Sequence, residues 1–556
     1  MRSILNQISW VSCAVDRLLW VIDKDPLSPT YGCAHLDYWR DKTSDVSDAR
    51  RQESMLPLAL LYTHDFQNTS CWKGNPVLLN SVQALLNFWI KSQYSDGSLD
   101  EWYKGERAFA AAAFTAHAVA RTLEIVSSLI DPVLESRARN ALSKTAAWLT
   151  VHDDLFKTNH QAVGAGALAY CGRVLGAPHL FQACRCKLDS IVAVQNQEGW
   201  FPEVTHMDLG YTFLTVEFAA MAMEVLQDWS WAEPFSKAFD FACEWLNPDL
   251  TLHDEYGVCH NPYVSLSAPF LMAKYSSRAA WIARQFAECE LGFAGLRATM
   301  ADDLRLPRWS FQPLVAYEYA RNTPWASYSS TPVPLADATS REAQYPKAGL
   351  LRRPLAKGKI VVASCAGGLV RFYSDTAKWS EFGYAIQDDG GSYATNLTYN
   401  RKIALDVRDD EIVMRCPINP VRRFMPTYLA RVALRLACST ALGSRFARKA
   451  IDFIRARKGT ALNQSSANLS ADSKAILTRT VRCVGSNVEL DDVLEFSSSV
   501  AVDTIQYLIA KGSEAMECVP LGQAASKLPT NVSKLRVLRR FSCSPEWQAI
   551  STRLEG

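Results

Sequence analysis

The chain has 556 residues, a formal net charge of +2 and 48% hydrophobic residues, which is typical of a globular protein with two or three domains. It lacks the basic excess of a nucleic-acid-binding protein, so we expect no nucleic acid as a partner. The 15 scattered cysteines fit neither a zinc knuckle nor a CxxC redox site, and they indicate reduced thiols in a cytoplasmic protein.

The beginning of the chain, residues 1–10, is polar and amphipathic. It lacks the apolar run and the small-residue cleavage site of a signal peptide. No window of about 18 consecutive residues is apolar, so we expect no transmembrane helix. These features also favour a cytoplasmic location.

Residues 1–300 carry apolar residues at spacings of three and four, which is the period of amphipathic helices. Small residues are frequent, as in 110–113, and allow neighbouring helices to approach closely. About eleven helices fit this length, which is enough for a ring of five to six hairpins. We predict a catalytic (α/α) toroid over 1–300, with helices at 76–94, 106–129, 132–151, 158–176, 179–196, 209–228, 232–247 and 277–293.

One stretch of this helical half occurs twice, at 93–109 and at 195–213. Each copy leaves a helix, makes an acidic-Gly turn, crosses a loop rich in aromatic residues and carboxylates, and enters the next helix. The turn glycines Gly97 and Gly199 lie 102 positions apart (199 − 97), about the length of two helical hairpins. Such a repeat places both loops on one face of the ring, where we expect the chemistry to occur.

The repeated loops also carry side chains suited to carbohydrates. Tryptophan rings can stack on sugar faces, and an arginine can bind a carboxylate. Either tryptophan could instead anchor its loop. The substrate-binding residues predicted on these loops are Trp102, Glu106, Arg107, Trp200, Glu203 and His206.

All nine histidines lie between residues 35 and 260, so imidazole chemistry must come from the helical half. Thr158 or Asn159 can cap the helix that begins there, which places His160 in its first turn. A helix N-terminus disfavours a protonated imidazole, so His160 is expected to be neutral and able to accept a proton at about pH 7. The alternative is a capped helix with a surface histidine.

Tyr211 follows the second repeated loop and begins the next helix, 52 residues after Asn159 (211 − 159). In a ring of hairpins this separation is one step around the ring. Asn159, His160 and Tyr211 are therefore predicted to project into one cleft from neighbouring hairpins.

Beyond residue 300 the pattern changes. The segment 301–358 is interrupted by prolines, among them Pro307, Pro313, Pro324, Pro332 and Pro334, and we interpret it as a linker. From 359 onward apolar residues alternate with a period of two, which indicates strands. Many strands at short spacing predict an antiparallel β-sandwich over 359–556, so the fold class is α+β multidomain. Strands are expected at 359–364, 368–373, 402–407, 411–415, 481–484, 488–496 and 532–541.

A helical insertion interrupts the strands at 427–458. Between Asn419 and Lys458 the chain has ten Lys or Arg residues and one acid, Asp452, a net charge of +9. A solvated basic helix pair explains this composition. The functional alternatives are contact with a membrane surface and a clamp for an anionic polymer.

This combination of features resembles the heparinase II/III-like superfamily of polysaccharide lyases, which includes heparinases and oligoalginate lyases. The resemblance covers the order of toroid and sandwich, the pair Asn159 and His160, and the later Tyr211. The segments 32–42 and 51–53 are similar to the entry segment of heparinase-like proteins associated with bacterial surface polysaccharides.

The resemblance implies β-elimination at a uronic acid, within an acidic polysaccharide or oligosaccharide, without a cofactor. Asn159, helped by Gln52 or Arg107, would hydrogen-bond the uronate carboxylate and stabilise the aci-anion. Tyr211 or His160 would take the C5 proton, and the Tyr211 hydroxyl would deliver a proton to the leaving oxygen.

The sequence departs from this family in its β-region. Lyases of this family commonly use a His or Tyr from the sandwich, and some hold a metal there with His. The β-region here has no His, which excludes a His-ligated metal within it. Tyrosines remain as candidates to complete the site, and Tyr393 is preferred among Tyr373, Tyr384, Tyr393 and Tyr399.

Two other functions stay open. Asp100 or Glu101 with Glu203 or Asp208 could form the acid and base of a glycoside hydrolase, although each carboxylate could equally cap a helix. A non-catalytic glycan-binding or assembly protein of a surface-polysaccharide pathway is the third possibility.

Overall fold

The computed structural model describes most of the 556 residues. Its description leaves out Asn68, Leu155, Thr205, Pro248, 253–255, Val258, His260, 290–301, 334–341, 356–357, 364–366, 374–377, 396–404, 409–410, 422–426, 465–472, 485–486, 512–516, 522–527, 544–546 and Gly556. The candidate Tyr399 and the last residues of the helix predicted at 277–293 lie outside the described residues.

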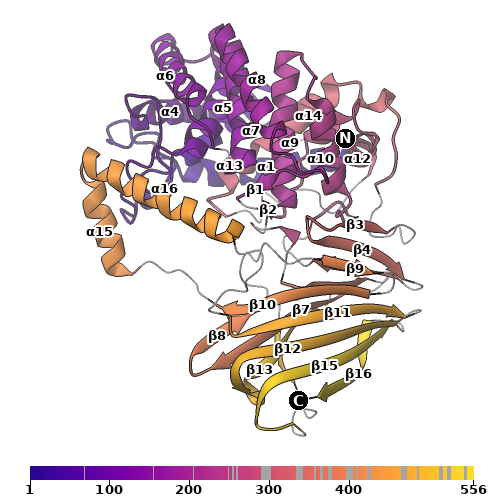
Figure 1. Cartoon of the computed structure of the whole chain (residues 1–556). Coiled ribbons are helices and arrows are strands. Elements are labelled where there is room, and N and C mark those ends of the chain that lie inside the picture. The colour runs from indigo at the N-terminus through magenta and orange to yellow at the C-terminus, as the bar shows by residue number, and fades with distance from the viewer. Residues whose placement is uncertain are drawn as a thin grey trace.

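The first part of the chain is helical, and the second part is a large antiparallel sheet (Figure 1). This confirms the α+β class. The helices of the first part are α1 (Arg2–Trp20), α2 (Leu36–Trp39), η1 (Ala49–Ser54), α3 (Met55–Thr63), α4 (Pro76–Ser92), α5 (Phe109–Val126), α6 (Pro132–Thr150), α7 (Thr158–Leu175), α8 (Pro178–Val192), α9 (Leu209–Leu226), α10 (Ala232–Cys243), α11 (Ala268–Met272), α12 (Ser277–Glu288), α13 (Leu306–Trp309), α14 (Phe311–Asn322) and η3 (Trp325–Ser327).

Six of these helices form a closed circuit of contacts. Helices α3, α5, α7, α9, α11 and α14 touch one another in this order, and α14 returns to α3. Helices α4, α6, α8, α10 and α12 connect them. Because α5, α7 and α9 alternate with connecting helices, they share one direction, and their N-termini lie at the same end of the circuit. The loops before these N-termini are the two repeated loops and residues 151–157.

Helices α5 and α9 are long and apolar enough, by length and composition, to cross a membrane. Most of each helix is buried within the helical half. Packing in this core therefore accounts for their apolar composition.

The segment 301–358, predicted as a linker, contains α13 and α14 and the first strands. Pro307 lies in the first turn of α13 and Pro313 is the third residue of α14. A proline in the first turn loses no intrahelical hydrogen bond, so both prolines are compatible with helix starts. Helix α14 also completes the circuit by its contacts with α3 and α11.

A short β1 (Pro202–Glu203) and β2 (His206–Met207) pair with each other inside the second repeated loop. The remaining strands form one sheet in the order β16-β15-β12-β11-β10-β8-β7-β6-β5-β4-β3, with β9, β13 and β14 beside this path. Their bounds are β3 (Ala343–Tyr345), β4 (Leu350–Leu355), β5 (Gly358–Ala363), β6 (Leu369–Tyr373), β7 (Lys378–Asp388), β8 (Gly391–Ala394), β9 (Leu405–Arg408), β10 (Glu411–Pro420), β11 (Ala475–Val484), β12 (Asn487–Ala501), β13 (Ile505–Lys511), β14 (Glu517–Pro520), β15 (Asn531–Cys543) and β16 (Trp547–Glu555), with η5 (Val502–Thr504) between β12 and β13.

Strands from the two ends of this sheet bury a common core. The Phe372 ring of β6 stacks on Phe541 of β15 at a centroid distance of 4.8 Å. The buried Tyr384 hydroxyl of β7 donates to Asp492 of β12 at 2.8 Å, and Arg479 of β11 pairs with the same carboxylate at 2.7 Å. Residues of these strands therefore share one buried core.

The helical part and the sheet meet through buried polar and aromatic contacts. The Glu244 carboxylate, after α10, pairs with Arg352 of β4 at 2.7 Å and with Arg278 of α12. Tyr256 and Tyr373 join their hydroxyls at 3.1 Å. These contacts hold one edge of the sheet against the helices (Figure 1).

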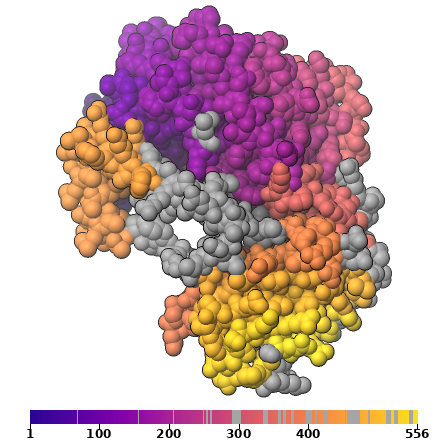
Figure 2. All heavy atoms as spheres, in the orientation of Figure 1, coloured from indigo at the N-terminus to yellow at the C-terminus, as the bar shows by residue number. Residues whose placement is uncertain are grey.

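The basic insertion forms two helices, α15 (Tyr428–Cys438) and α16 (Ala441–Gln464), that leave β10 and return to β11. We call them the α15–α16 hairpin. It projects from the sheet and lies beside the first helices of the chain (Figures 1 and 2). Thirteen cysteines in the described part of the chain are free.

Candidate functional site

The acidic-Gly turns of the two repeated loops have the same backbone geometry. Gly97 and Gly199 both have positive φ, 92° and 105°, and each turn is closed by a bond from the glycine N–H to the carbonyl three residues earlier. Each glycine packs against the backbone of the following outer helix, at Lys144 in α6 and at Lys237 in α10. The repeat seen in the sequence is therefore a structural repeat.

The second loop is tied to the start of α7. Lys157 and Glu203 form an isolated antiparallel bridge, and the Thr158 hydroxyl donates to the Pro202 carbonyl at 2.8 Å. Val204 follows with φ of 60°, a strained conformation for a β-branched residue. This backbone arrangement brings the side chains of Asn159 and Glu203 together.

Asn159 and Glu203 form a buried polar pair. The Asn159 Nδ2 lies 2.6 Å from Glu203 Oε2, and both side chains are almost fully buried. The Asn159 Oδ1 finds no hydrogen-bond partner among the described residues. Burial raises the pKa of Glu203 to about 8, although the amide and Lys157 act in the opposite direction. Glu203 is therefore mostly protonated at neutral pH.

Tyr211 lies in the first turn of α9, half-buried, beside the same acid. Asp208 caps this helix by accepting from the Tyr211 backbone N–H at 3.0 Å. Burial, followed by the negative charge of Glu203, raises the phenol pKa of Tyr211 above its ordinary value, and Arg50 partly opposes the shift. Tyr211 and Asn159, predicted to converge, thus share Glu203 as a neighbour.

His160 points toward α5 rather than toward Glu203. Its Nδ1 lies 2.8 Å from Asp154 Oδ2, and its ring meets the Phe114 ring edge-on at 6.2 Å. Desolvation lowers the pKa of His160 below its ordinary value, although Asp154 acts to raise it. A neutral imidazole is the form expected from the sequence. Asp154, which the sequence analysis did not single out, orients the ring.

Arg50 lies near Tyr211 and Phe114, and no pattern in the sequence marked it as a candidate. Its guanidinium carbon lies 3.6 Å from the centre of the Phe114 ring, and its Nε donates to Glu53 at 2.7 Å. Arg50 is buried but remains charged because Glu53 and Glu101 raise its pKa against desolvation. The only sequence signal was the Arg50–Glu53 spacing of three.

A groove runs from His160 to the α15–α16 hairpin. One cavity, of about 610 Å³, is lined by His160, Trp102 and Arg107. A second, of about 570 Å³, lies between the first repeated loop and α16. The two adjoin because both are lined by Arg107, Trp148, His152 and Arg448. Of the three residues predicted to be catalytic, His160 alone belongs to the described lining of these cavities.

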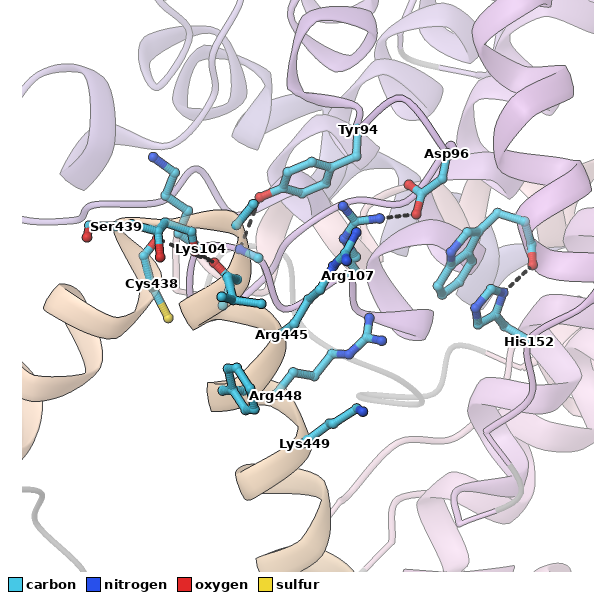
Figure 3. A pocket seen from close by; sticks show the side chains of 17 residues that line it. Tyr94, Asp96, Lys104, Arg107, His152, Cys438, Ser439, Arg445, Arg448 and Lys449 are labelled. Carbon is cyan, nitrogen blue, oxygen red and sulfur yellow. Dashed lines mark hydrogen bonds and ion pairs between the residues drawn. The ribbon is translucent and has the colours of Figure 1, made fainter.

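The second cavity is strongly cationic (Figure 3). Arg445, Arg448 and Lys449 extend from α16 on the side of Arg107. Arg107 pairs with Asp96, which is the one carboxylate among the described lining residues. The lining cations are Lys104, Arg107, Arg445, Arg448 and Lys449.

Other predicted residues occupy structural positions. Gln52 is fully buried, and its amide binds the backbone of Gly32, Ala34 and Leu85. Glu106 accepts from the backbone N–H groups of residues 101 and 102 and closes the first loop. The structure does not bring Gln52 to the groove.

The aromatic residues predicted to contact substrate fall into two groups, one exposed at the groove and one away from it. Trp102 is 63% exposed at the groove rim, which suits sugar stacking. Trp200 is buried and stacks on His206 at 5.2 Å. Its Nε1 donates to Glu198, which also binds the backbone at the start of the sheet. Tyr393 lies in β8 beside Lys474 and is absent from the described linings of the cavities.

The four carboxylates considered for hydrolysis are also mostly occupied. Asp100 accepts from Tyr94 and from two backbone N–H groups of its loop. Asp208 caps α9, and Glu101 pairs with Arg308 at 3.1 Å. Burial raises the pKa of Glu203, the fourth of these carboxylates, to about 8.

No protein-family model matches this chain, and no curated protein matches its sequence. Solved structures do match. The chondroitin AC lyase of Streptomyces coelicolor A3, in complex with chondroitin sulphate, is 9% identical with a TM-score of 0.57, over 99% of this chain and 76% of that one. A Paenibacillus xanthan lyase is 9% identical with a TM-score of 0.54, over 97% of this chain and 51% of that one.

These likenesses extend over nearly the whole chain, so the order of helices and sheet is that of the matched lyases. The chain spans about half the length of the xanthan lyase. At such low identity the likeness concerns the fold. The chain thus has the fold of polysaccharide lyases.

Proposed function

We propose that this protein is a polysaccharide or oligosaccharide lyase that cleaves an acidic glycan by β-elimination at a uronic acid. The observation that carries the proposal is the cluster of Asn159, Glu203 and Tyr211 at the mouth of a lyase fold, with His160 on the adjacent groove. The heparinase II/III-like resemblance and a role in a bacterial surface-polysaccharide pathway belong to the same proposal.

Proton removal from C5 is the first task of the site. The C5 proton is weakly acidic, since the neighbouring carboxylate resists a second negative charge. His160 is suited as the base because desolvation keeps its pKa low and Asp154 fixes its Nδ1, which leaves Nε2 to accept the proton.

Asn159 and Glu203 would bind the uronate carboxylate. Their separation of 2.6 Å suits an O–H···O bond better than an N–H···O bond. A protonated Glu203 can donate to the Asn159 oxygen if the amide is turned over, which leaves Nδ2 at the position of the unpartnered atom. That Nδ2 can then donate to the substrate carboxylate and stabilise the aci-anion, an effect worth about 3 kcal/mol for one such donor.

Tyr211 would protonate the leaving oxygen. Its raised pKa keeps the phenol protonated at neutral pH, which favours the role of acid over that of base. The buried Arg50 is near enough to Tyr211 to lower the phenol pKa, so it would stabilise the phenolate that proton transfer leaves.

The groove supports an anionic substrate. Cations from the first repeated loop and from α16 face each other across it, and Trp102 offers an exposed ring at its rim. The matched Streptomyces structure holds chondroitin sulphate, a polymer with carboxylates, which supports the same substrate class here.

The first prediction concerns product chemistry. A panel of uronate-containing polysaccharides, incubated with the protein, should yield products that absorb in the ultraviolet, because elimination creates a C4–C5 double bond conjugated with the carboxylate. Tyr211→Phe and Asn159→Ala should each lower the rate at least 100-fold. Tyr211→Phe should keep the unfolding temperature, whereas Asn159→Ala removes the amide partner of the buried Glu203 and should lower it.

Val133→Ala, an exposed change far from the loops, is the matched control and should keep full activity. New reducing ends without ultraviolet absorbance would instead identify a hydrolase. Glycan binding with neither signal would identify a non-catalytic binding protein, and full activity of Tyr211→Phe would remove the proposed acid.

A further inference from the structure

The α15–α16 hairpin has one face turned toward the helical half. Ser444 is buried there, so close to Gly105 that a Cβ added to the glycine would lie 2.4 Å from the serine Cβ. Arg435 pairs with Asp45, and Cys438 is buried. This face is accounted for by docking and by the groove.

The hairpin also exposes large apolar side chains, which form what we call its outer face. Tyr428, Leu442 and Phe446 of this set also border the cavities, whereas Leu429, Leu436 and Phe453 lie outside their described linings. Of the sixteen such side chains exposed in the described part of the chain, six lie on this hairpin, and each is between 64% and 78% exposed. Spacings of four and seven place Leu442, Phe446 and Phe453 on one stripe of α16, and Leu429 and Leu436 share a face of α15. The six are Tyr428, Leu429, Leu436, Leu442, Phe446 and Phe453.

Cations border this apolar stripe. Lys449 follows Phe446 by three residues and precedes Phe453 by four, so it lies on the same side of α16. Arg445 and Lys449 of α16 and Arg431 of α15 line the cavities and are also exposed to solvent. Long basic side chains beside apolar ones can reach lipid headgroups while the apolar groups enter the layer below.

We propose that the outer face of the α15–α16 hairpin binds the surface of an anionic lipid bilayer. Charge complementarity selects this occupant. The segment 427–458 carries eight Lys or Arg residues and one acid, so a second copy of the same face would be repelled. Anionic headgroups attract such a basic segment. The apolar side chains of the stripe can then enter the boundary between the headgroups and the acyl chains.

The proposal gives the hairpin two roles. Its inner face forms a wall of the groove, and its outer face holds the protein at the membrane. Membrane binding does not depend on lyase activity, so the two proposals can fail separately.

Co-sedimentation of the full chain with vesicles tests the proposal. The protein should sediment with vesicles of phosphatidylcholine mixed with phosphatidylglycerol, and much less with phosphatidylcholine alone. Raising the salt concentration should weaken the binding. The triple variant Leu429→Gln, Leu436→Gln and Phe453→Gln should lower the affinity for the vesicles at least tenfold, because it removes apolar side chains that would enter the bilayer. These three side chains lie outside the described cavity linings, so the groove keeps its lining residues.

The matched control carries Val133→Gln and Val151→Gln, two exposed apolar residues of the helical half, and should bind like the unaltered chain. Equal thermal unfolding of both variants shows that they fold. The proposal is overturned if the unaltered chain ignores the anionic vesicles or binds both compositions equally. Unchanged binding by the triple variant also overturns it. A further contrary outcome is a chain that does not bind vesicles but forms a concentration-dependent dimer, if the triple variant abolishes that dimer and the control variant does not.

Discussion

Two carboxylates at equivalent positions of the repeat have different surroundings. Glu101 and Glu203 lie 102 positions apart (203 − 101), the same interval as the turn glycines. Glu101 faces Arg308 and Arg50, which neutralise it as an anion. Glu203 faces the neutral amide of Asn159, so burial dominates and raises its pKa to about 8. One backbone motif thus supplies an ion-paired acid in one copy and a protonated acid in the other.

Glu203→Gln tests the protonated state. We expect the activity of the unaltered protein to fall as the pH rises through about 8, because ionised Glu203 can no longer donate a hydrogen bond to Asn159. Glutamine has no such titration, so the alkaline limb should disappear from the pH profile of the variant, while the acidic limb from His160 remains. An alkaline limb near pH 8 that persists in the variant would contradict this assignment.

The same substitution should change the pH dependence of stability. The pKa of the carboxyl is near 4.5 in the unfolded chain and about 8 in the folded protein. Between these values the unfolded state binds fewer protons, so the free energy of unfolding should decrease as the pH rises from about 4.5 to 8. Chemical unfolding at several pH values should show this decrease weakened in Glu203→Gln.

At the residue scale, part of the candidate site could be predicted from the sequence. Spacing along a ring of hairpins indicates which helix starts are neighbours. The spacing of Asn159 and Tyr211 therefore predicted their proximity, and both lie beside Glu203. Gln52 had no such support, and its amide is used by three backbone groups. Arg50 and Asp154 depend on side-chain contacts across different hairpins, which a single sequence does not encode as a pattern.

At the scale of elements, the turn glycine of each loop sets how closely the loop packs. Gly97 has φ of 92°, and a Cβ added there would lie 2.3 Å from the Lys144 carbonyl oxygen of α6. The chain before α5 is therefore held against the outer helix that follows it. This contact fixes where the loop, with Trp102 and Arg107, meets the groove.

Gly97→Ala should destabilise the protein by about 2 kcal/mol, since it combines a strained positive φ with a backbone clash. Gly176→Ala is the control, because Gly176 also has positive φ, 62°, but no atom lies within 4 Å of an added Cβ. The control should cost about 1 kcal/mol. Urea unfolding measures both, and equal losses would show that the contact with Lys144 has no effect.

Most predicted helices agree with the structure within a few residues because periodicity and capping residues are local signals. Helix α14 was missed, since its proline was interpreted as a helix breaker although it lies in the first turn. Strands such as β7 and β13 were missed because both faces are partly buried, which removes the alternation of apolar and polar residues.

At the scale of the whole molecule, the buried carboxylate of Glu244 joins the two parts. It pairs with Arg352 of β4 and with Arg278 of α12. The side chains of Glu244 and Arg352 are almost fully buried. Charges buried in this way depend on each other, because either one alone would lack compensation. No local pattern marked these residues, since the pairing spans more than 100 positions.

Glu244→Gln should therefore lower the free energy of unfolding by about 3 kcal/mol, because two arginines lose their counter-charge. Glu495→Gln, which breaks an exposed pair with Lys534, should cost less than about 1 kcal/mol. Chemical unfolding followed by fluorescence compares the two. Equal losses would show that the buried pair does not hold the parts together.

The excursion that carries α15 and α16 begins and ends at one point of the sheet. Ile418 of β10 pairs with Ala475 of β11, and the Lys474 N–H donates to the Ile418 carbonyl at 2.9 Å. Asn419 and Pro420 still pair with β8, and the Val421 N–H donates to the Ser392 carbonyl, so only a connection that keeps these residues would leave the strand ladders unaltered. A shorter connection would also remove the α16 wall of the second cavity, so this one excursion sets both the border of the groove and a large share of the exposed apolar surface.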